Sequence, residues 1–476
     1  MGADSIPVNP WMMLPFGILL ASIALGPLLF PAWWNRQYPK VAYFLGAIVV
    51  CYYFVGLRQP ARVWDAIHEY VSFIALIGSL FVVAGGIHIS VKGEATPLAN
   101  VIFLLAGALA ANILGTTGAS MLLIRPWLRM NHYRITGHHV VFFIFTVSNV
   151  GGCLTPIGDP PLFLGYLAGI PFWWVTTHCL PVWAVGVSLL LVMFFVVDYR
   201  NYTRAPKQVR SEQTSHHDAW KFAGLRNLLF LPIILVAVFI DHPAFLREAL
   251  MLAAAAGSYL LTHKSVHESN HFNFHPIQEV AVLFIGIFAT MMPALDWLQS
   301  NAHTLQQTTP GVFYWSCGGL SSALDNAPTY LCFLKAMFGR FVDRDVATQV
   351  AALVQSHGAN LSGLIGTHTE DVRQTYATLQ KYYAPELTRG VVSTDQIETA
   401  FLLGHLKFNA YLVAISVASV FFGANTYIGN GPNFMVKSIA DQQKVSTPGF
   451  PEYIFRYTLP FMLPVLAIVW WIFFRE

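Results

Sequence analysis

Long apolar stretches recur along the whole chain, and they restrict the folds available to it more than any other feature. Two examples are LLLVMFFVVDY at 189–199 and FMLPVLAIVWWIFF at 461–474. Only 11% of the 476 residues are charged and 55% are hydrophobic, whereas a soluble domain has about a quarter charged residues. Because a helix needs about 20 mostly apolar residues to cross a bilayer, the sequence predicts an all-α polytopic membrane protein.

Apolar windows predict about 10 to 13 membrane segments, several of them interrupted by Gly and Pro. Two polar segments separate these windows, 198–225 and 339–398. We therefore expect an N-terminal membrane half at 1–197, a linker at 198–225 and a C-terminal membrane half at 226–476 with a polar insertion at 339–398. The linker has a modest basic excess, which favours the cytoplasmic side.

The chain lacks the motifs of the common soluble enzymes. It has no Walker motif, no GxSxG and no HExxH, and these are the local signatures of ATP binding, of a nucleophilic serine and of a zinc protease. The five cysteines show no CxxC spacing and are typical of small buried hydrophobic residues. We expect no enzymatic activity, no cofactor and no nucleic-acid partner.

A weak internal repeat divides the chain. Similar sequence surrounds three pairs of positions: Gly78 and Gly286, Leu114 and Leu324, and Thr155 and Thr426. The first two pairs have nearly the same separation along the chain. The third pair is farther apart, by about the length of the polar segment 339–398, which lies in the required interval. One insertion into a duplicated sequence explains this jump. Duplicated membrane halves are typical of secondary transporters.

The third pair belongs to a motif that is present in both halves, TPIGDPP at 155–161 and TYIGNGP at 426–432. Its prolines and glycines break helices, and non-helical backbone survives in a membrane only inside protein or beside a water-filled cavity. Broken helices can present carbonyl groups to a cation and helix N-termini to an anion. An ordinary inter-helix turn is the alternative. Neutral oxygen atoms near the motifs come from Ser148, Asn149, Thr155, Asn425, Thr426, Asn430 and Asn433.

A second signal is SSALDNAPTY at 321–330, in the middle of the apolar span 311–338. A carboxylate at the bilayer centre costs several kcal/mol unless it faces a cavity or a partner. Asp325, Asn326 and Pro328 together predict the tip of a re-entrant hairpin. The alternative is a structural acid that pairs with Lys335. In the first half, Gly115, Thr116 and Thr117 occupy the corresponding positions.

Each half thus contributes one carboxylate in surroundings of neutral polar groups. The first half contributes Asp159 and the second half contributes Asp325. Oxygen ligands suit a hard monovalent cation such as Na⁺, and a buried carboxylate also exchanges protons. Two acids would repel a multiply charged organic anion unless cations accompany it, so the residues favour cation exchange over anion uptake. Asp65 and Glu69 lie near the start of an apolar span and are expected at the membrane interface. Glu279 is expected to cap or line the start of a helix, and a role in ion entry is the alternative.

At these residues the sequence resembles the ion transporter superfamily, which includes sodium/proton antiporters, citrate and dicarboxylate carriers and arsenite pumps. SNVGGCLTPIGDPP at 148–161 is similar to the signature of its antiporter and arsenite branches, and LDNAPTY at 324–330 resembles their second hairpin tip. The similarity covers roughly 60–170 and 275–440. Gly-Thr-Thr at 115–117 departs both from the Ser-Asn-Thr of dicarboxylate carriers and from the Asp-Asn of some antiporters.

The resemblance implies two inverted repeats, each with a re-entrant hairpin and a broken helix, in a homodimer with an elevator-type mechanism. We predict a multi-pass transporter in a bacterial cytoplasmic membrane that exchanges Na⁺ for protons at Asp159 and Asp325. A cation-coupled carrier of citrate or another organic anion is the first alternative, and a non-transporting membrane scaffold or receptor is the second. The predicted binding residues are Thr116, Thr117, Ser148, Asn149, Thr155, Asp159, Asp325, Asn326, Asn425, Thr426, Asn430 and Asn433.

Overall fold

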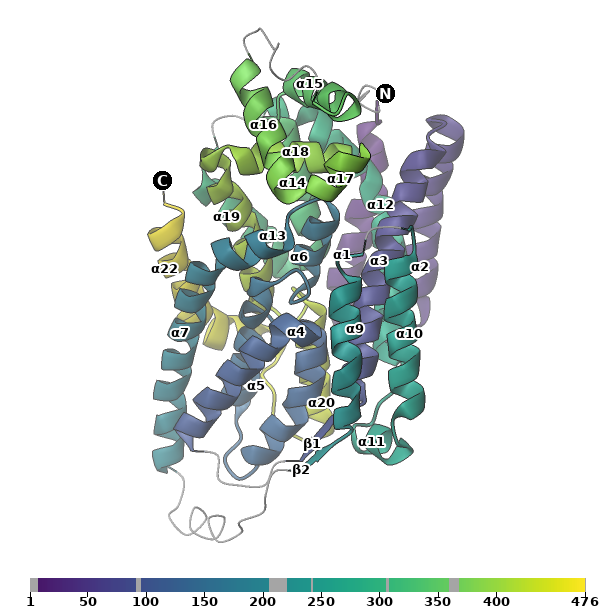
Figure 1. The fold of residues 1–476 in the computed structure, drawn as a ribbon. Coiled ribbons are helices and arrows are strands. Elements are labelled where there is room, and N and C mark those ends of the chain that lie inside the picture. The colour runs from purple at the N-terminus through teal and green to yellow at the C-terminus, as the bar shows by residue number, and fades with distance from the viewer. Residues whose placement is uncertain are drawn as a thin grey trace.

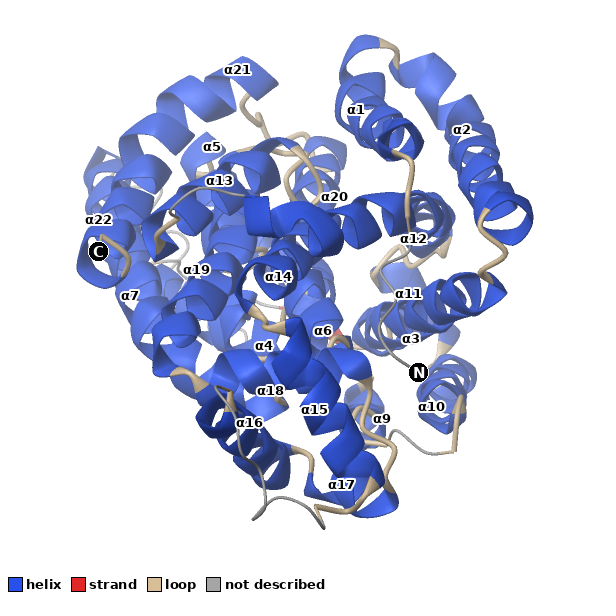
Figure 2. Cartoon of the chain, turned by 90° about the horizontal axis from the view of Figure 1, so that it is seen from above, coloured by secondary structure: helices blue, strands red, loops and turns tan. Residues whose placement is uncertain are grey.

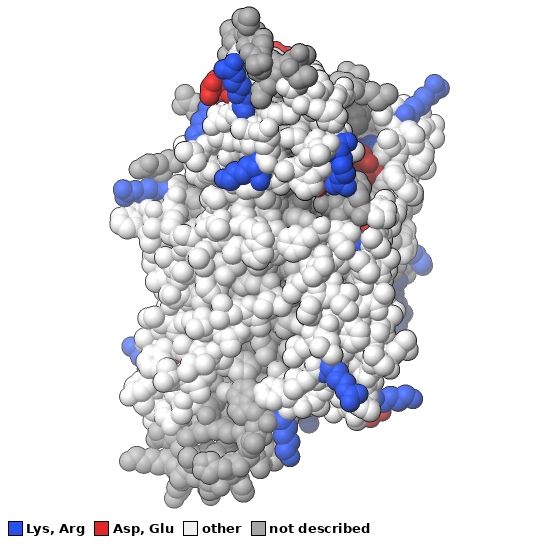
Figure 3. Space-filling view, viewed as in Figure 1, with Lys and Arg blue, Asp and Glu red and all other residues white. Residues whose placement is uncertain are grey.

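The fold of this chain, seen in a computed structural model, is almost entirely helical (Figure 1). The structure describes residues 7–90, 96–204, 221–240, 243–304, 308–358 and 368–475. Nine helices in these ranges are long and apolar enough to span a membrane. On the face shown in Figure 3, Lys, Arg, Asp and Glu lie mostly toward the two ends of the molecule, and the broad middle of the face is uncharged except along one edge. The prediction of an all-α polytopic membrane protein is confirmed.

The first half of the chain forms the elements α1 to α7 and one short strand. Their bounds are η1 (Pro10–Met13), α1 (Leu14–Leu29), α2 (Pro31–Cys51), η2 (Tyr52–Gly56), α3 (Pro60–Gly85), β1 (His88–Ser90), α4 (Pro97–Met130), α5 (Gly137–Thr146), η3 (Val150–Leu154), α6 (Pro160–Leu167) and α7 (Phe172–Arg204). The expected boundary at 197 falls inside α7, because that helix continues to Arg204. Most of the linker, 205–220, lies outside the described residues.

The second half begins with β2, which pairs antiparallel with β1. Its first elements are β2 (Lys221–Ala223), η4 (Leu225–Leu229), α9 (Phe230–Ala237), α10 (Leu246–Leu261), α11 (Lys264–Ser269), α12 (His275–Asn301), η5 (Ala302–Thr304), α13 (Pro310–Ala323) and α14 (Asn326–Phe341). The remainder are α15 (Arg344–Gln355), α16 (Thr369–Tyr382), α17 (Ala384–Arg389), α18 (Thr394–Gly404), α19 (Leu406–Phe422), η7 (Gly423–Asn425), α20 (Gly431–Gln442), α21 (Phe450–Tyr453), η8 (Ile454–Met462) and α22 (Leu463–Phe473).

The helices form two groups, which Figure 2 shows side by side. We call α1, α2, α3, α9, α10 and α12 the flank group, and α4 to α7, α13, α14, α19, α20 and α22 the hairpin group. Between the groups, α3 packs against α4 and α6, and α12 packs against α14. All residues of the two repeated motifs belong to the hairpin group. The motifs therefore lie in one body and face the flank group mainly through α3 and α12.

Two re-entrant hairpins enter the hairpin group from opposite ends (Figure 1). The first is α4, which lies in the lower part of the view and breaks at Gly115, where φ is 72° and ψ is 156°. A positive φ of this kind is readily adopted only by glycine. The second hairpin is α13 and α14 in the upper part, and it turns at Leu324 and Asp325. The different backbone at the two tips explains why the first has glycine where the second has an acid.

Two broken helices run beside the hairpins. The first consists of α5 and α6, separated by 147–159, and the second of α19 and α20, separated by 423–430. Inside each break the chain approaches itself closely: a Cβ at Gly158 would lie 2.1 Å from the carbonyl oxygen of Gly152, and one at Gly429 would lie 2.7 Å from that of Gly423. Gly158 and Gly429 occupy the same position in the two copies of the motif, so the two breaks share one backbone arrangement.

The insertion 339–398 contributes most of a small helical cap, which we define as α15 to α18. A core that includes Val346, Val350, Val372 and Leu379 holds it together. The cap lies at the end of the molecule opposite β2 and the end of α7, the described elements on either side of 205–220 (Figure 1). We call these ends the cap end and the linker end. Residues 359–367 of the insertion lie outside the described residues.

The cap joins the outer ends of two half-helices. The Lys335 ammonium of α14 pairs with Asp395 of α18 at 2.7 Å, and the Tyr383 hydroxyl donates to the Gly169 carbonyl just after α6. A third bond runs from the side-chain amide of Gln299, in α12 of the flank group, to both carboxylate oxygens of Glu398, at 2.8 and 3.0 Å. The cap is thus fixed to the hairpin group and also bonded to the flank group.

A buried charge cluster at the linker end ties α7 to the first hairpin. Asp198, which is fully buried, accepts hydrogen bonds from the Arg134 guanidinium, the Asn100 amide at 2.9 Å and His139 at 3.0 Å. Removing one partner of such a group leaves an uncompensated buried charge, which typically costs about 3–5 kcal/mol. The cluster fixes where α4, α5 and α7 meet.

Replacing Gly158 by alanine should destabilise the protein strongly. The new Cβ would lie 2.1 Å from a backbone oxygen, which a side-chain rotation cannot relieve, and such overpacking costs about 1–3 kcal/mol or more. Thermal unfolding of the purified protein in detergent measures the effect. Gly431→Ala is the matched control, because a Cβ there meets no atom within 4 Å. Equal melting temperatures for the two variants would contradict this account of the break.

The stability of the cap should fall as the pH rises through the titration of Glu398. Burial raises the pKa of Glu398 from 4.5 to about 7, although Lys335 and Arg344 partly oppose the shift. The folded state therefore binds more protons than the unfolded state between these values. The stability contributed by protonated Glu398 is complete below pH 4.5 and is lost as the pH approaches 7.

Glu398→Gln should flatten the dependence of the melting temperature on pH between 5 and 7, since one group contributes at most about 1.4 kcal/mol per pH unit. Glu370→Gln, at an exposed position on α16, is the control and should leave the slope unchanged. If Glu398→Gln has the same slope as the parent protein, Glu398 does not titrate in this range.

Candidate functional site

Asp159 lies at the centre of the hairpin group, where only 1% of its surface is exposed. Three neutral side chains donate hydrogen bonds to its carboxylate: the Thr116 hydroxyl at 2.6 Å, the Asn326 amide at 2.6 Å and the Asn430 amide at 3.1 Å. These donors come from the first hairpin, the second hairpin and the second broken helix. No Lys, Arg or His of the described ranges forms an ion pair with Asp159.

The four residues of this centre are related by the internal repeat. Thr116 and Asn326 occupy equivalent positions in the alignment that pairs Leu114 with Leu324, and Asp159 and Asn430 are equivalent in the repeated motif. The two hairpin tips therefore contact the same carboxylate from the two halves of the chain. Asp159 and its amide counterpart Asn430 contact each other at the middle of the duplicated structure.

A second layer of amides supports Asn430. Its amide also donates to the Asn149 side-chain oxygen and to the Ser148 carbonyl, both at 3.1 Å. Asn149 in turn donates to the Asn433 side-chain oxygen at 2.7 Å. The Ser148 hydroxyl lies 2.7 Å from that of Ser120. Since all of these groups are buried and hydrogen-bonded, they hold the central amide in one orientation.

The threonines of the two motifs have equivalent local roles. Thr155 donates to the Asn112 carbonyl and Thr426 to the Ser322 carbonyl, each at 2.7 Å. Each hydroxyl also accepts a bond from the backbone N–H three residues later, that of Gly158 or Gly429, at 3.1 Å. These threonines fasten each broken helix to its own hairpin. Their hydroxyls are directed to these backbone groups instead of Asp159, so they position the site without touching its centre.

Asp325 lies outside this hydrogen-bonded centre. Its carboxylate accepts a bond from the Ala327 N–H at 3.1 Å and thereby caps α14, and it makes no hydrogen bond to Asp159. The alternative pairing with Lys335 is wrong, because Lys335 binds Asp395 of the cap. Asp325 is partly exposed and has no cationic partner in the described ranges.

A small cavity of about 20 Å³ lies against Asp159, between α3, the tip of the first hairpin and the start of α6. Thr117 is among the residues that line it. A cavity of this size holds about one water-sized particle. The buried side-chain oxygen of Asn326 has no hydrogen-bond partner in the described part of the chain, although its amide nitrogen donates to Asp159. The centre thus contains a carboxylate and an unpaired amide oxygen, and the carboxylate borders room for one small particle.

Asn425 has another unpaired oxygen in this region. Its amide nitrogen donates to the Ser322 hydroxyl at 2.8 Å, whereas its side-chain oxygen is buried without a partner among the described residues. Ser322 belongs to the second hairpin, shortly before Asp325. The second half therefore contributes polar oxygens beside its hairpin tip as well as at the centre.

Helix N-termini point toward the same region. Three half-helices, α6, α14 and α20, begin directly after Asp159, Asp325 and Asn430. Partial positive charge at helix N-termini stabilises a nearby anion. Since no basic side chain of the described ranges bonds to the centre, these termini and the three donors stabilise the Asp159 carboxylate. The same field would also act on an anionic substrate.

Another group of possible metal ligands, His138, His139 and Asp198, is not free to bind an ion. The Arg134 guanidinium occupies the Asp198 carboxylate, and a cation there would meet that positive charge. The cluster is structural, as described for the linker end.

Several contributors to the site were not identified from the sequence. Asn112 holds the first break through its side chain, which accepts from the Leu154 N–H at 2.9 Å and donates to the Gly151 carbonyl at 2.7 Å. Ser120 and Ser322 were missed as well. Asn112 and Ser322 are equivalent in the same hairpin alignment that relates Thr116 to Asn326, so an extension of this alignment along the hairpins could have found them.

The chain belongs to a transporter family described as "Putative citrate transport", whose model matches residues 5–474. No curated protein matches this chain. The family agrees with the resemblance found in the sequence at the level of a membrane transporter for ions or citrate.

Asp159→Asn should reduce transport to background without loss of the fold. The substitution keeps the size of the side chain and removes the charge of the Asp159 centre. Asp325→Asn is the companion variant: asparagine caps a helix as well as aspartate, so α14 should persist while the accessible charge is lost. We expect transport to fall to background in both variants with unchanged melting temperatures. Undiminished flux in either variant would remove that residue from the mechanism.

Proposed function

We propose that the protein is a secondary transporter that exchanges Na⁺ for protons at Asp159. The observation that carries this proposal is one fully buried carboxylate with three neutral hydrogen-bond donors and a cavity for a single small particle. Sodium ions prefer oxygen ligands. Carboxylate and amide oxygens at the centre meet this preference.

Coupling follows from the cost of a buried charge. An ionised Asp159 that moves through the membrane core without a partner costs several kcal/mol, whereas binding of one proton or one Na⁺ neutralises it. The loaded site can therefore change sides and the empty site cannot. Because Na⁺ and the proton use the same carboxylate, they compete for it. The site therefore carries one of the two ions in one direction and the other ion on its return.

Asn326 can serve both forms of the site. Its amide nitrogen donates to the ionised carboxylate, and its oxygen has no partner among the described residues. When Na⁺ is bound, or when Asp159 carries a proton, rotation of this amide would offer the oxygen as a ligand or acceptor. We assign Asp325 to cation capture at the edge of the site, where it is partly exposed.

The two helix groups suit an elevator-type movement, with the hairpin group sliding against the flank group. All four residues of the centre lie in the hairpin group and would move together. We further propose that the chain works as a homodimer in a bacterial cytoplasmic membrane, as the resemblance of the sequence implies.

Cation-coupled transport of citrate is the second candidate. The family description and the three helix N-termini at the site favour it. Against it stand two carboxylates and the absence of a basic side chain bonded to the centre in the described ranges. Citrate would need a site larger than the cavity at Asp159, which is far below the about 300 Å³ usual for organic ligands.

Proteoliposomes with an internal pH indicator discriminate between the two functions. An inward Na⁺ gradient should drive proton efflux and raise the internal pH, and vesicles with Asp159→Asn should show no change. Labelled citrate should not accumulate. If citrate accumulates with the Na⁺ gradient and the internal pH stays constant, the exchange proposal is wrong and the citrate function replaces it.

A further inference from the structure

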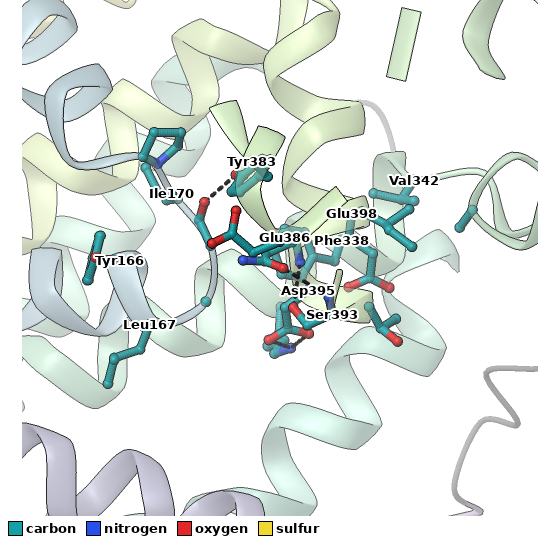
Figure 4. Close-up of a pocket in the computed structure, with 18 of the residues that line it drawn as sticks. Tyr166, Leu167, Ile170, Phe338, Val342, Tyr383, Glu386, Ser393, Asp395 and Glu398 are labelled. Atoms are coloured by element: carbon teal, nitrogen blue, oxygen red, sulfur yellow. Dashed lines mark hydrogen bonds and ion pairs between the residues drawn. The ribbon is translucent and has the colours of Figure 1, made fainter. Parts of the chain in front are cut away.

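A large cavity of about 1410 Å³ lies beneath the cap. Its wall includes α3 and α12 of the flank group, α6 and α14 of the hairpin group, and the cap itself. Figure 4 shows Asp395 and Glu398 of α18, and Glu386 of α17, across the cavity from the segment that contains Tyr166 and Ile170. The lining residues Arg344, Thr348 and Lys381 are exposed on the cap. The cavity therefore reaches the surface at the cap end.

One face of α3 connects this cavity with Asp159. Asp65 and Glu69 line the large cavity, and Leu76 and Leu80, farther along the same helix, line the small cavity at Asp159. The step from Glu69 to Leu76 spans about 10 Å along a helix. The intervals of four, seven and four positions keep these side chains on one side of α3. The helix thus forms a continuous wall from the surface opening to the site.

The other wall is α6, which begins directly after Asp159. Leu164 lines the large cavity and Phe163 the small one. The two cavities are therefore separated by little more than one layer of apolar side chains, to which Leu76, Leu80 and Phe163 belong. In this structure that layer closes the short path between them.

Glu69 differs in its bonding from the other charged groups on the cap side of this apolar layer. Arg62 pairs with Asp296 at 3.1 Å, and Lys335 pairs with Asp395. Below Glu69, the Ser72 hydroxyl donates to Glu248, which Arg247 also contacts at 3.1 Å. Glu69 itself makes no hydrogen bond or ion pair with any residue that the structure describes. It lies within electrostatic reach of Arg62, Lys335 and Asp395.

We propose that the cavity beneath the cap is the entry vestibule through which the transported cation reaches Asp159, and that Glu69 is the last carboxylate to contact it before the apolar layer. The role of Glu69 rests on the proposed cation exchange, whereas the vestibule requires only that the protein transports a solute. The insertion 339–398 then has a function: it builds one wall of the path and narrows access to the site.

Charge at the vestibule fits a small cation. Six carboxylates and five Lys or Arg side chains line it, so negative charge exceeds positive charge by one. Among the described residues, the carboxylates of Asp65 and Glu69 form no ion pair. Glu386 forms an ion pair with Arg389 at 3.5 Å at the surface. The Glu398 carboxylate accepts a hydrogen bond from the neutral side-chain amide of Gln299. A cavity lined by an excess of one sign of charge concentrates ions of the opposite sign.

Blocking the vestibule tests the route. Ser300, in α12, lines the cavity, and Ser446 is exposed after α20 at the linker end. Each is replaced by cysteine in a background with Cys51→Ser and Cys332→Ser, since the other three cysteines are buried. The purified variants react with a bulky, positively charged methanethiosulfonate in detergent and are then reconstituted, so that orientation in the vesicle does not limit access.

Modified Ser300→Cys should lose at least about tenfold of its flux, because the adduct fills the path and repels cations. Modified Ser446→Cys should keep the flux of the unmodified background. The flux measured is the activity that the unmodified Cys51→Ser, Cys332→Ser protein shows, which is either proton exchange or citrate uptake. Unchanged flux in modified Ser300→Cys would overturn the vestibule, and so would an equal loss at the two positions.

Glu69→Gln tests the carboxylate separately. The apparent KM for Na⁺ should rise about tenfold, which corresponds to about 1.4 kcal/mol, with little change in the maximal rate. Asp65→Asn, an exposed change at the rim on the same helix face, should have a much smaller effect. A lower maximal rate with an unchanged KM would show a structural role instead and overturn the assignment. If the parent protein takes up citrate without proton exchange, the proposed function fails while the Ser300 result still decides the route.

Discussion

The cost of one buried carboxylate governs the rest of this structure. Asp159 is almost completely buried, and an ionised group in such a place must be satisfied by nearby donors or by a bound cation. Thr116, Asn326 and Asn430 supply the donors, and each comes from a different discontinuous element. The hairpin tips and broken helices meet at this point, and their non-helical backbone is tolerated because it lies inside the protein.

Duplication provides the geometry for this meeting. Two copies of one hairpin and one broken helix approach from opposite ends, so that Thr116 and Asn326 contact the same carboxylate. Divergence at the middle then makes the site asymmetric, because Asp159 in one copy faces Asn430 in the other. Two carboxylates in direct contact would repel each other, whereas an acid and an amide form a hydrogen bond. The acid-for-amide difference between the two motifs is therefore what allows both to lie at one centre.

The cap contacts two of the half-helices that begin at the site. It binds α14 through Lys335 and Asp395, and it binds the end of α6 through Tyr383. The opposite ends of these two half-helices carry Asn326 and Asp159. The bond between Gln299 and Glu398 is one described link from the cap to the flank group, and a sliding movement between the groups would have to break it.

The sequence was sufficient for features that depend on local composition and spacing. Apolar windows identified a membrane protein because lipid excludes charge, and the repeat alignment matched the positions that meet at Asp159. Thr116 was found only because it aligns with Asn326, since a threonine in an apolar segment has no signal of its own. Contacts between distant segments could not be read in this way: Lys335 binds Asp395 instead of Asp325, and Asp198 depends on Arg134, which precedes it by more than one helix.

The sequence by itself thus determined that the chain crosses a membrane repeatedly, that it is duplicated and that two acids interrupt its apolar segments. Only the tertiary structure decided how those acids differ. Asp159 is enclosed by donors from both halves, whereas Asp325 caps its own helix and stays partly exposed. The physical reason is that burial and hydrogen bonding depend on which helix ends converge in space, and convergence is a property of packing between segments far apart in the chain.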